Sequence, residues 1–277
     1  MSLVEGVIHD MPPEEYHAAV AMSSSGLRHM AKSPAHFFGM QLDPNRPPPN
    51  PTPAMEAGTL FHTALFEPEK FDERYIVKPE KIDMRTKEGK AWSVAAGTRN
   101  PITEDDFRRS VTQARRIRAL PEVGALLSEG VGEASAFWVD KLTGEWCKCR
   151  PDWVSPAGDG VILLDGKTSK DASQNGFSRA IWNWRYDLQA AWYSEGYEAA
   201  TGKPVHGFVF AVTESDWPHA SAAYILDDVV LEAARRECRR LLDQYAECRR
   251  SESWPGYPET IQPITLPAWA MKEIENE

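Results

Sequence analysis

The sequence is poor in cysteine and lacks long apolar runs. Its 277 residues include only Cys147, Cys149, Cys238 and Cys248, at spacings that form no tight metal-binding pair. Four cysteines in a chain of this length do not suggest a disulfide framework, so we expect buried or half-exposed thiols. No stretch reaches the roughly eighteen apolar residues that a membrane span needs, so no transmembrane helix is expected.

Positive charge is also scarce. Lys and Arg total 31 against 41 Asp and Glu, a formal net charge of −10. This balance argues against binding nucleic acid through bulk charge, but it leaves open a local basic groove or a carboxylate site for cations. The N-terminal segment MSLVEGVIHDMPPEEYH lacks the basic and then apolar layout of a signal peptide, which predicts a cytoplasmic protein.

What is present suits a globular protein with a sizeable core. Hydrophobic residues make up 42% of the chain and charged residues 26%, and no internal repeat is visible. The length allows one large domain or two small ones. The patterns favour a single domain over residues 1–277, with a mostly helical part at 1–125 and an α/β core at 126–277.

The first part reads as helices separated by a proline-rich segment. Serines before Gly26 resemble a helix cap, and Pro34 ends the helix that follows. Residues 44–53 predict an extended, mobile loop because proline dominates them. Apolar spacing then predicts helices over 54–66 and 104–120, with a short strand at 74–77.

The second part alternates strands and helices. A β-hairpin turns at 141–144, and VILLD at 161–165 is a continuous apolar run typical of a strand buried on both faces. We expect the following elements after it: a polar loop and one long helix closed by Gly202, strands at 207–214 and over SAAYILD, and a helix at 228–249. These elements predict an α/β fold, a mixed central sheet flanked by helices behind a helical N-terminal portion.

Charged side chains stand at the end of the buried run. Asp165 and Lys167 lie two residues apart on the predicted strand, so both point to one face. Asp152 precedes Asp165 by thirteen residues across the turn PAGDG, so antiparallel strands would bring the two carboxylates together. Asp165 and Lys167 taken alone also suit a solvated strand end, because so short a motif recurs by chance.

Two converging carboxylates repel each other unless a cation lies between them. Mg²⁺ prefers such oxygen ligands and keeps several waters. A lysine beside the metal can orient an attacking water or stabilise charge developing on a phosphate. The chemistry that this grouping predicts is metal-assisted hydrolysis of a phosphodiester.

These residues resemble the PD-(D/E)xK nuclease superfamily, whose core is restriction-endonuclease-like. Pro151-Asp152 and Asp165-Gly166-Lys167 match its central motif, with Asp165 where glutamate is more usual. Gln189 and Tyr193 match the Q-x-x-x-Y element of its RecB-like and lambda-exonuclease-like branches and share one helix face. Residues 58–62, GTLFH, match a G-x-x-x-H element of that branch.

A closer resemblance is to the family of prophage exonuclease VIII (RecE) nucleases. The phrases that carry it run in order from residue 22 to residue 270, and they are MSSSGLRHMAKSPAHF, GTLFHTALFEP, CRPDW, LLDGKTSKDAS, F-x-x-A-I-x-x-W-x-Y-x-x-Q-x-A-x-Y and LPAWA. The resemblance implies that His62, Asp152, Asp165 and the Gly166 carbonyl hold Mg²⁺, with Mn²⁺ as a substitute. It further implies that Lys167 positions the attacking water, while Gln189 and Tyr193 support the site or contact the DNA backbone.

The same resemblance implies a function. It predicts an exodeoxyribonuclease that degrades linear double-stranded DNA from its ends, 5′ to 3′, and exposes single strands for recombination. A homo-oligomeric ring and a RecT-like annealing protein are the implied partners. The alternatives are an inactive DNA-end-binding or annealing factor and a structure-specific endonuclease.

Other residues suit more than one role. Trp182, Trp184 and Tyr186 can stack on bases, although packing of their helix onto the sheet is the favoured reading, and Trp192 is expected in the core. Glu133 resembles an additional acidic residue of such sites. Arg28, Lys32, Arg150 and Arg185 are candidate phosphate contacts, whereas His36 and His206 have no motif.

Overall fold

The computed structural model describes residues 3–48, 50–83, 85–267 and 270–272. Pro49 of the proline-rich segment and two residues of the LPAWA phrase, Ala268 and Trp269, therefore lie outside the described residues. The first part of the chain is mostly helical, as expected. Its elements are β1 (Gly6–Ile8), α1 (Pro13–Ala18), α2 (Ser24–Lys32), α3 (Pro34–Phe37), the π-helical turn η1 (Phe38–Leu42), α4 (Pro53–Phe66), η2 (Pro68–Lys70), α5 (Phe71–Arg74), β2 (Tyr75–Val77), α6 (Lys87–Ala96), β3 (Asn100–Ile102), α7 (Glu104–Arg118) and α8 (Pro121–Leu126).

The second part carries the main sheet. Its elements are β4 (Val131–Gly132), β5 (Ser135–Val139), β6 (Trp146–Cys149), β7 (Trp153–Ala157), β8 (Gly160–Ser169), α9 (Gln174–Trp184), α10 (Tyr186–Thr201), β9 (Val205–Glu214), β10 (Ser221–Ile225) and α11 (Asp228–Ser251). Five strands run in the order β10-β9-β8-β7-β4, with β8 and β9 parallel and the other neighbours antiparallel. The predicted mixed α/β sheet is confirmed. The expected hairpin, β5 and β6, belongs to a separate three-stranded sheet with β1.

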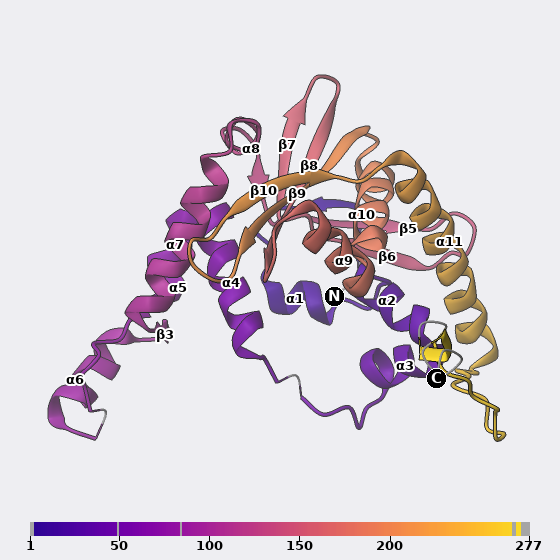
Figure 1. Ribbon diagram of the computed structural model, residues 1–277, viewed down its shortest axis with the longest axis horizontal. Helices are drawn as coiled ribbons and strands as arrows, with labels where there is room; N and C mark the ends of the chain where they lie inside the picture. The colour runs from indigo at the N-terminus through magenta and orange to yellow at the C-terminus, as the bar shows by residue number, and fades with distance from the viewer. Residues whose placement is uncertain (1–2, 49, 84, 268–269, 273–277) are drawn as a thin grey trace.

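The apolar run of β8 serves two cores, one on each face of the sheet. Leu163 packs into the core formed with α10 and α11, while Leu164 packs into the core formed with α4 and α7. Both leucines are fully buried because successive side chains of a strand point to opposite faces. Figure 1 shows the two helix pairs on opposite sides of the sheet, with α4 and α7 on one side and α10 and α11 on the other. Strand β8 is thus the central partition of the molecule.

The predicted long helix before Gly202 is broken into α9 and α10. Arg185 separates them with a left-handed backbone, φ 53° and ψ 45°, and its N–H donates to the carbonyls of Ile181 and Trp182. Neither glycine nor proline marks this break, and the Arg185 guanidinium instead donates two 3.1 Å hydrogen bonds to Asp187. Gly202 closes α10 at φ 71°, as expected. Among the described helices, none has both the length and the apolar character to cross a membrane.

Close packing of α10 onto β5 requires a glycine. A Cβ added at Gly196 would lie 2.2 Å from Cη2 of Trp138. We expect Gly196→Ala to destabilise the fold by about 3 kcal/mol, because the buried indole has nowhere to move. Gly207→Ala is the control, since a Cβ there meets no atom within 4 Å. Thermal unfolding measures both, and equal melting temperatures for the two variants would contradict the packing described.

Candidate active site

The site lies where β7 and β8 meet helices α4 and α10. The register pairs Trp153 with Leu164, which sets Asp152 opposite Asp165 on the neighbouring strand. The Gly166 N–H donates to Oδ2 of Asp152 at 2.7 Å. Both carboxylates are buried, with residue exposures of 8% for Asp152 and 1% for Asp165. The turn therefore returns Asp152 beside Asp165, as the spacing predicts. Strand β8 does not end there, because its pairing with β9 continues to Ser169.

Asp165 is held by two side chains on its own face of the sheet. Its Oδ2 accepts from Nζ of Lys167, and its Oδ1 accepts from Nε2 of Gln189 on α10 at 2.5 Å. The Lys167 ammonium also lies 4.7 Å from the ring centroid of Tyr186, a cation–π contact. Burial alone would lower the pKa of Lys167, but the charges of Asp165 and Asp152 outweigh it and raise that pKa. Lys167 is therefore a fixed cation.

His62 reaches the same place from the opposite face. Thr52 caps α4 and Pro53 opens it, and the helix buries Leu60, Phe61 and Leu65 against the sheet. His62 Nε2 donates to the Gly166 carbonyl at 2.9 Å, and Nδ1 lies 3.5 Å from Oδ2 of Asp152. Burial, and then the charge of Lys167, lower the pKa of His62, so its imidazole is neutral and Nδ1 keeps a lone pair.

Gly166 makes this approach of α4 to β8 feasible. A Cβ at this position would lie 2.9 Å from Cε2 of Phe66 and 3.1 Å from Cε1 of Phe61. The glycine between Asp165 and Lys167 therefore has a packing role on one face, while its neighbours carry charge on the other. Its carbonyl, expected as a metal ligand by resemblance, accepts the hydrogen bond from His62.

Glu133, which the sequence indicated as an additional acidic residue, lies beside His62 and Asp152. His62, Glu133 and Asp152 each offer one ligand atom, and these atoms all lie within 4.8 Å of one another. The Glu133 backbone is left-handed at φ 51°, an uncommon conformation for a residue with a side chain. Burial, and then the charge of Asp152, raise the pKa of Glu133 to about 7. Its position just before β5 gave no periodic signal, so resemblance alone could indicate it.

The donor set suits a divalent cation. Burial raises the pKa of Asp152 well above its usual value, and the charge of Asp165 raises it further. Three carboxylates, from Glu133, Asp152 and Asp165, surround two cations, Lys167 and the Arg150 guanidinium that lies 2.7 Å from Glu133. Carboxylate oxygens and a neutral imidazole are donors that hard or borderline divalent ions accept. Among the described residues, Asp152 is the carboxylate of the three that pairs with no lysine or arginine, and a divalent cation would balance its charge.

Two further aromatic residues named from the sequence lie on α10. Tyr193 is held on α10 against Phe208, with ring centroids 6.2 Å apart, and burial raises its pKa. Trp192 is buried in the core, as expected, and its indole N–H donates to the Lys148 carbonyl.

Two interpretations are wrong. Trp182 and Trp184 do not pack onto the sheet, because they are 72% and 61% exposed. Arg150 is not open to phosphate, because its side chain is largely buried against Glu133 and hydrogen-bonds to the Met11 carbonyl.

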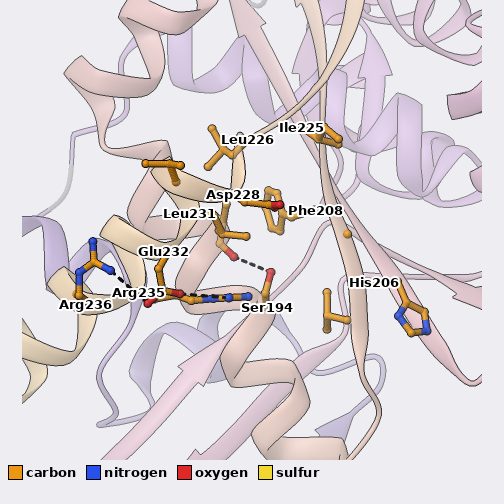
Figure 2. Close-up of a pocket in the computed structure, with 14 residues that line it drawn as sticks. Ser194, His206, Phe208, Ile225, Leu226, Asp228, Leu231, Glu232, Arg235 and Arg236 are labelled. Carbon is orange, nitrogen blue, oxygen red and sulfur yellow. Dashed lines mark hydrogen bonds and ion pairs between the residues drawn. The ribbon is translucent and has the colours of Figure 1, made fainter.

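A separate surface cavity of about 650 Å³ lies between α10, β9 and α11. Figure 2 shows His206, Arg235 and Glu232 among its lining side chains. Arg235 Nη1 lies 3.6 Å from Oε2 of Glu232, and His206 Nε2 lies 2.8 Å from Oδ1 of Asp159. None of the candidate catalytic residues lines this cavity, so it is not the place of the proposed chemistry.

A mixed sheet with buried carboxylates and a lysine where two of its strands meet defines the PD-(D/E)xK class of folds. The chain belongs to the family described as a PDDEXK-like domain of unknown function (DUF3799), whose profile matches residues 23–267. The resemblance to the PD-(D/E)xK superfamily is thereby confirmed, as is the restriction-endonuclease-like fold. The sequence matches no curated protein.

A solved structure shares this architecture. The crystal structure of a candidate exonuclease from Eubacterium rectale superposes with a TM-score of 0.64 at 16% identity, over 96% of this chain and 98% of that one. At this identity the likeness shows the fold alone. A structure of the protein SSO0001 reaches a TM-score of only 0.29 at 14% identity, over 50% of this chain and 67% of that one.

Proposed function

We propose that the chain is a Mg²⁺-dependent exodeoxyribonuclease that degrades linear double-stranded DNA from its ends and exposes single strands for recombination. The observation that carries this is the group of half-buried His62 and Glu133 and buried Asp152 beside the paired Asp165 and Lys167. Membership of the PDDEXK-like family supports phosphodiester hydrolysis by this group. The 5′-to-3′ direction, a ring of copies and a RecT-like annealing partner rest on the resemblance to exonuclease VIII nucleases.

Each residue has a role in the proposed reaction. His62, Asp152, Asp165 and the Gly166 carbonyl, joined by Glu133, would hold the metal. When bound, Mg²⁺ supplies charge neutralisation of the scissile phosphate and acidifies a bound water. Lys167 donates a hydrogen bond that orients the attacking water. The ring of Tyr186 contacts the Lys167 ammonium and restricts its movement. Gln189 fixes the Asp165 carboxylate, so the lysine keeps a single position. Tyr193 supports α10 behind the site or contacts the DNA backbone.

A comparison of linear and closed circular DNA tests the proposal. With Mg²⁺ or Mn²⁺, the purified protein should convert a linear duplex into nucleotides and single strands and leave a closed circular duplex of the same sequence intact. EDTA should abolish the hydrolysis, because the neighbouring carboxylates then repel each other and the phosphate without a cation. Acid-soluble nucleotide release and gel electrophoresis measure the outcome. Cleavage of circular or branched DNA would indicate an endonuclease, and metal-independent binding without hydrolysis would indicate an end-binding factor.

A further inference from the structure

Two tryptophans beside the site are exposed without a structural reason in the fold. Trp182 and Trp184, at the end of α9, are 72% and 61% exposed. Large indoles left in water are costly, and a group of them marks a contact surface. We name Trp182, Trp184 and the neighbouring Arg28 and Arg185 the indole platform.

The platform adjoins the candidate catalytic lysine. Tyr186 follows Trp184 by two residues, and its ring lies 4.7 Å from Nζ of Lys167. Arg28 of α2 donates from Nη1 to the Trp184 carbonyl at 3.3 Å, which ties α2 to the end of α9. Arg185 lies 5.9 Å from the Trp182 ring centroid. The chain thus places the exposed indoles within four residues of Tyr186, which contacts Lys167.

The platform is locally basic although the chain is acidic. No Asp or Glu occurs from residue 16 to 42 or from 172 to 186, the stretches that contain α2 and α9. The cations Arg28, Lys32, Arg179 and Arg185 lie in these stretches. Arg185 is paired with Asp187, whereas Arg28 forms no ion pair within the part of the chain that the structure describes. Local positive charge beside exposed aromatic rings is the combination that binds single-stranded nucleic acid.

We propose that the indole platform binds the unpaired bases of a DNA strand next to the scissile phosphate. Trp182 and Trp184 stack on bases, and Arg28 contacts the phosphate backbone. Stacking on an indole requires a base face that no neighbouring base covers, so the ligand is a single strand or a frayed end. This inference rests on the proposed function, because it assigns part of the substrate to the same site.

Binding measured without metal tests the platform independently of hydrolysis. The 277-residue protein is titrated in EDTA against a fluorescein-labelled oligothymidine of about twelve nucleotides, and fluorescence anisotropy gives the affinity. Trp182→Ala and Trp184→Ala should each weaken binding roughly five- to one-hundred-fold. Trp184→Phe should restore most of the loss, because a phenyl ring still stacks. Both side chains are exposed, so thermal unfolding should remain that of the wild type.

Two matched controls sharpen the result. Trp217→Ala removes an indole that is 76% exposed in the turn between β9 and β10, next to an acidic residue, and should leave the affinity unchanged. Arg28→Gln should lower the slope of log affinity against log salt by about one, whereas the tryptophan variants should keep that slope.

Several results would overturn the platform. Unchanged affinity of Trp182→Ala and Trp184→Ala, or an equal loss in Trp217→Ala, contradicts it. Unchanged affinity together with a shift in mass by light scattering would make the surface an interface between copies of the chain. If the tryptophan variants bind as tightly as the wild type and the wild type hydrolyses DNA, the platform is refuted but the proposed function is not. Absence of hydrolysis with any divalent metal refutes the proposed function, while the affinities still decide the platform.

Discussion

Lys167→Ala is expected to lower the rate of phosphodiester hydrolysis by roughly a thousand-fold. Within the described part of the chain, the ammonium is the cation that pairs with Asp165. Tyr186 lies against the ammonium, and Gln189 hydrogen-bonds to the Asp165 carboxylate. Its loss removes the donor that orients the attacking water and leaves neighbouring buried carboxylates without their partner. Initial rates on linear duplex at saturating Mg²⁺ measure the effect.

Folding must be separated from chemistry in this variant. Circular dichroism should show native secondary structure, and Lys167→Gln offers a second variant that keeps polar atoms near Asp165. Lys203→Ala is the control, because this lysine is exposed in the turn after α10. Rates close to the wild type for both Lys167 variants would refute the assignment of Lys167.

Asp152→Asn should abolish hydrolysis and yet raise the melting temperature of the metal-free protein. Burial and the charge of Asp165 raise the pKa of Asp152 in the folded state above its ordinary 3.8. The folded state then binds this proton more tightly than the unfolded state. The free energy of unfolding therefore falls as pH rises from the ordinary pKa of the carboxyl to its raised pKa in the folded state, and it stays lower above both. Asparagine carries no charge and can still accept the hydrogen bond from Gly166. In EDTA at pH 8 we expect a gain of several degrees, at about 2–4 °C per kcal/mol.

The pH dependence identifies the cause. The gain should shrink as pH falls towards 4, because the wild-type carboxyl is then protonated as well. Asp159→Asn is the control, since the hydrogen bond from His206 lowers the pKa of that exposed carboxyl and its loss brings no gain. Added Mg²⁺ should raise the melting temperature of the wild type but not of Asp152→Asn. A lower melting temperature of Asp152→Asn in EDTA at pH 8 would contradict the buried-charge argument.

The centre of the site could be predicted because it depends on local rules. Asp165 and Lys167 share a face by the two-residue period of a strand, and a short turn returns Asp152 to them. The buried run VILLD predicted a strand covered on both faces, which the two cores confirm. These inferences need no knowledge of distant parts of the chain.

The rest depends on contacts between distant segments. His62 lies 104 residues before its partner Gly166, so no spacing rule connects them and only the resemblance indicated it. The break at Arg185 has no glycine or proline to mark it. Helical periodicity placed Trp182 and Trp184 on a helix, but it could not show that both side chains are exposed to solvent.

The position of β8 between the two cores has a consequence for biosynthesis. The histidine belongs to the helix on one side, Gln189 to the helix on the other, and each reaches the site through its own core. Closing loops of this length is slow relative to forming local helices. A ribosome that has released α4 has yet to make β8, and α10 follows later still. A nascent chain therefore cannot assemble this group of residues before α10 has left the ribosome, and the site would form late in synthesis.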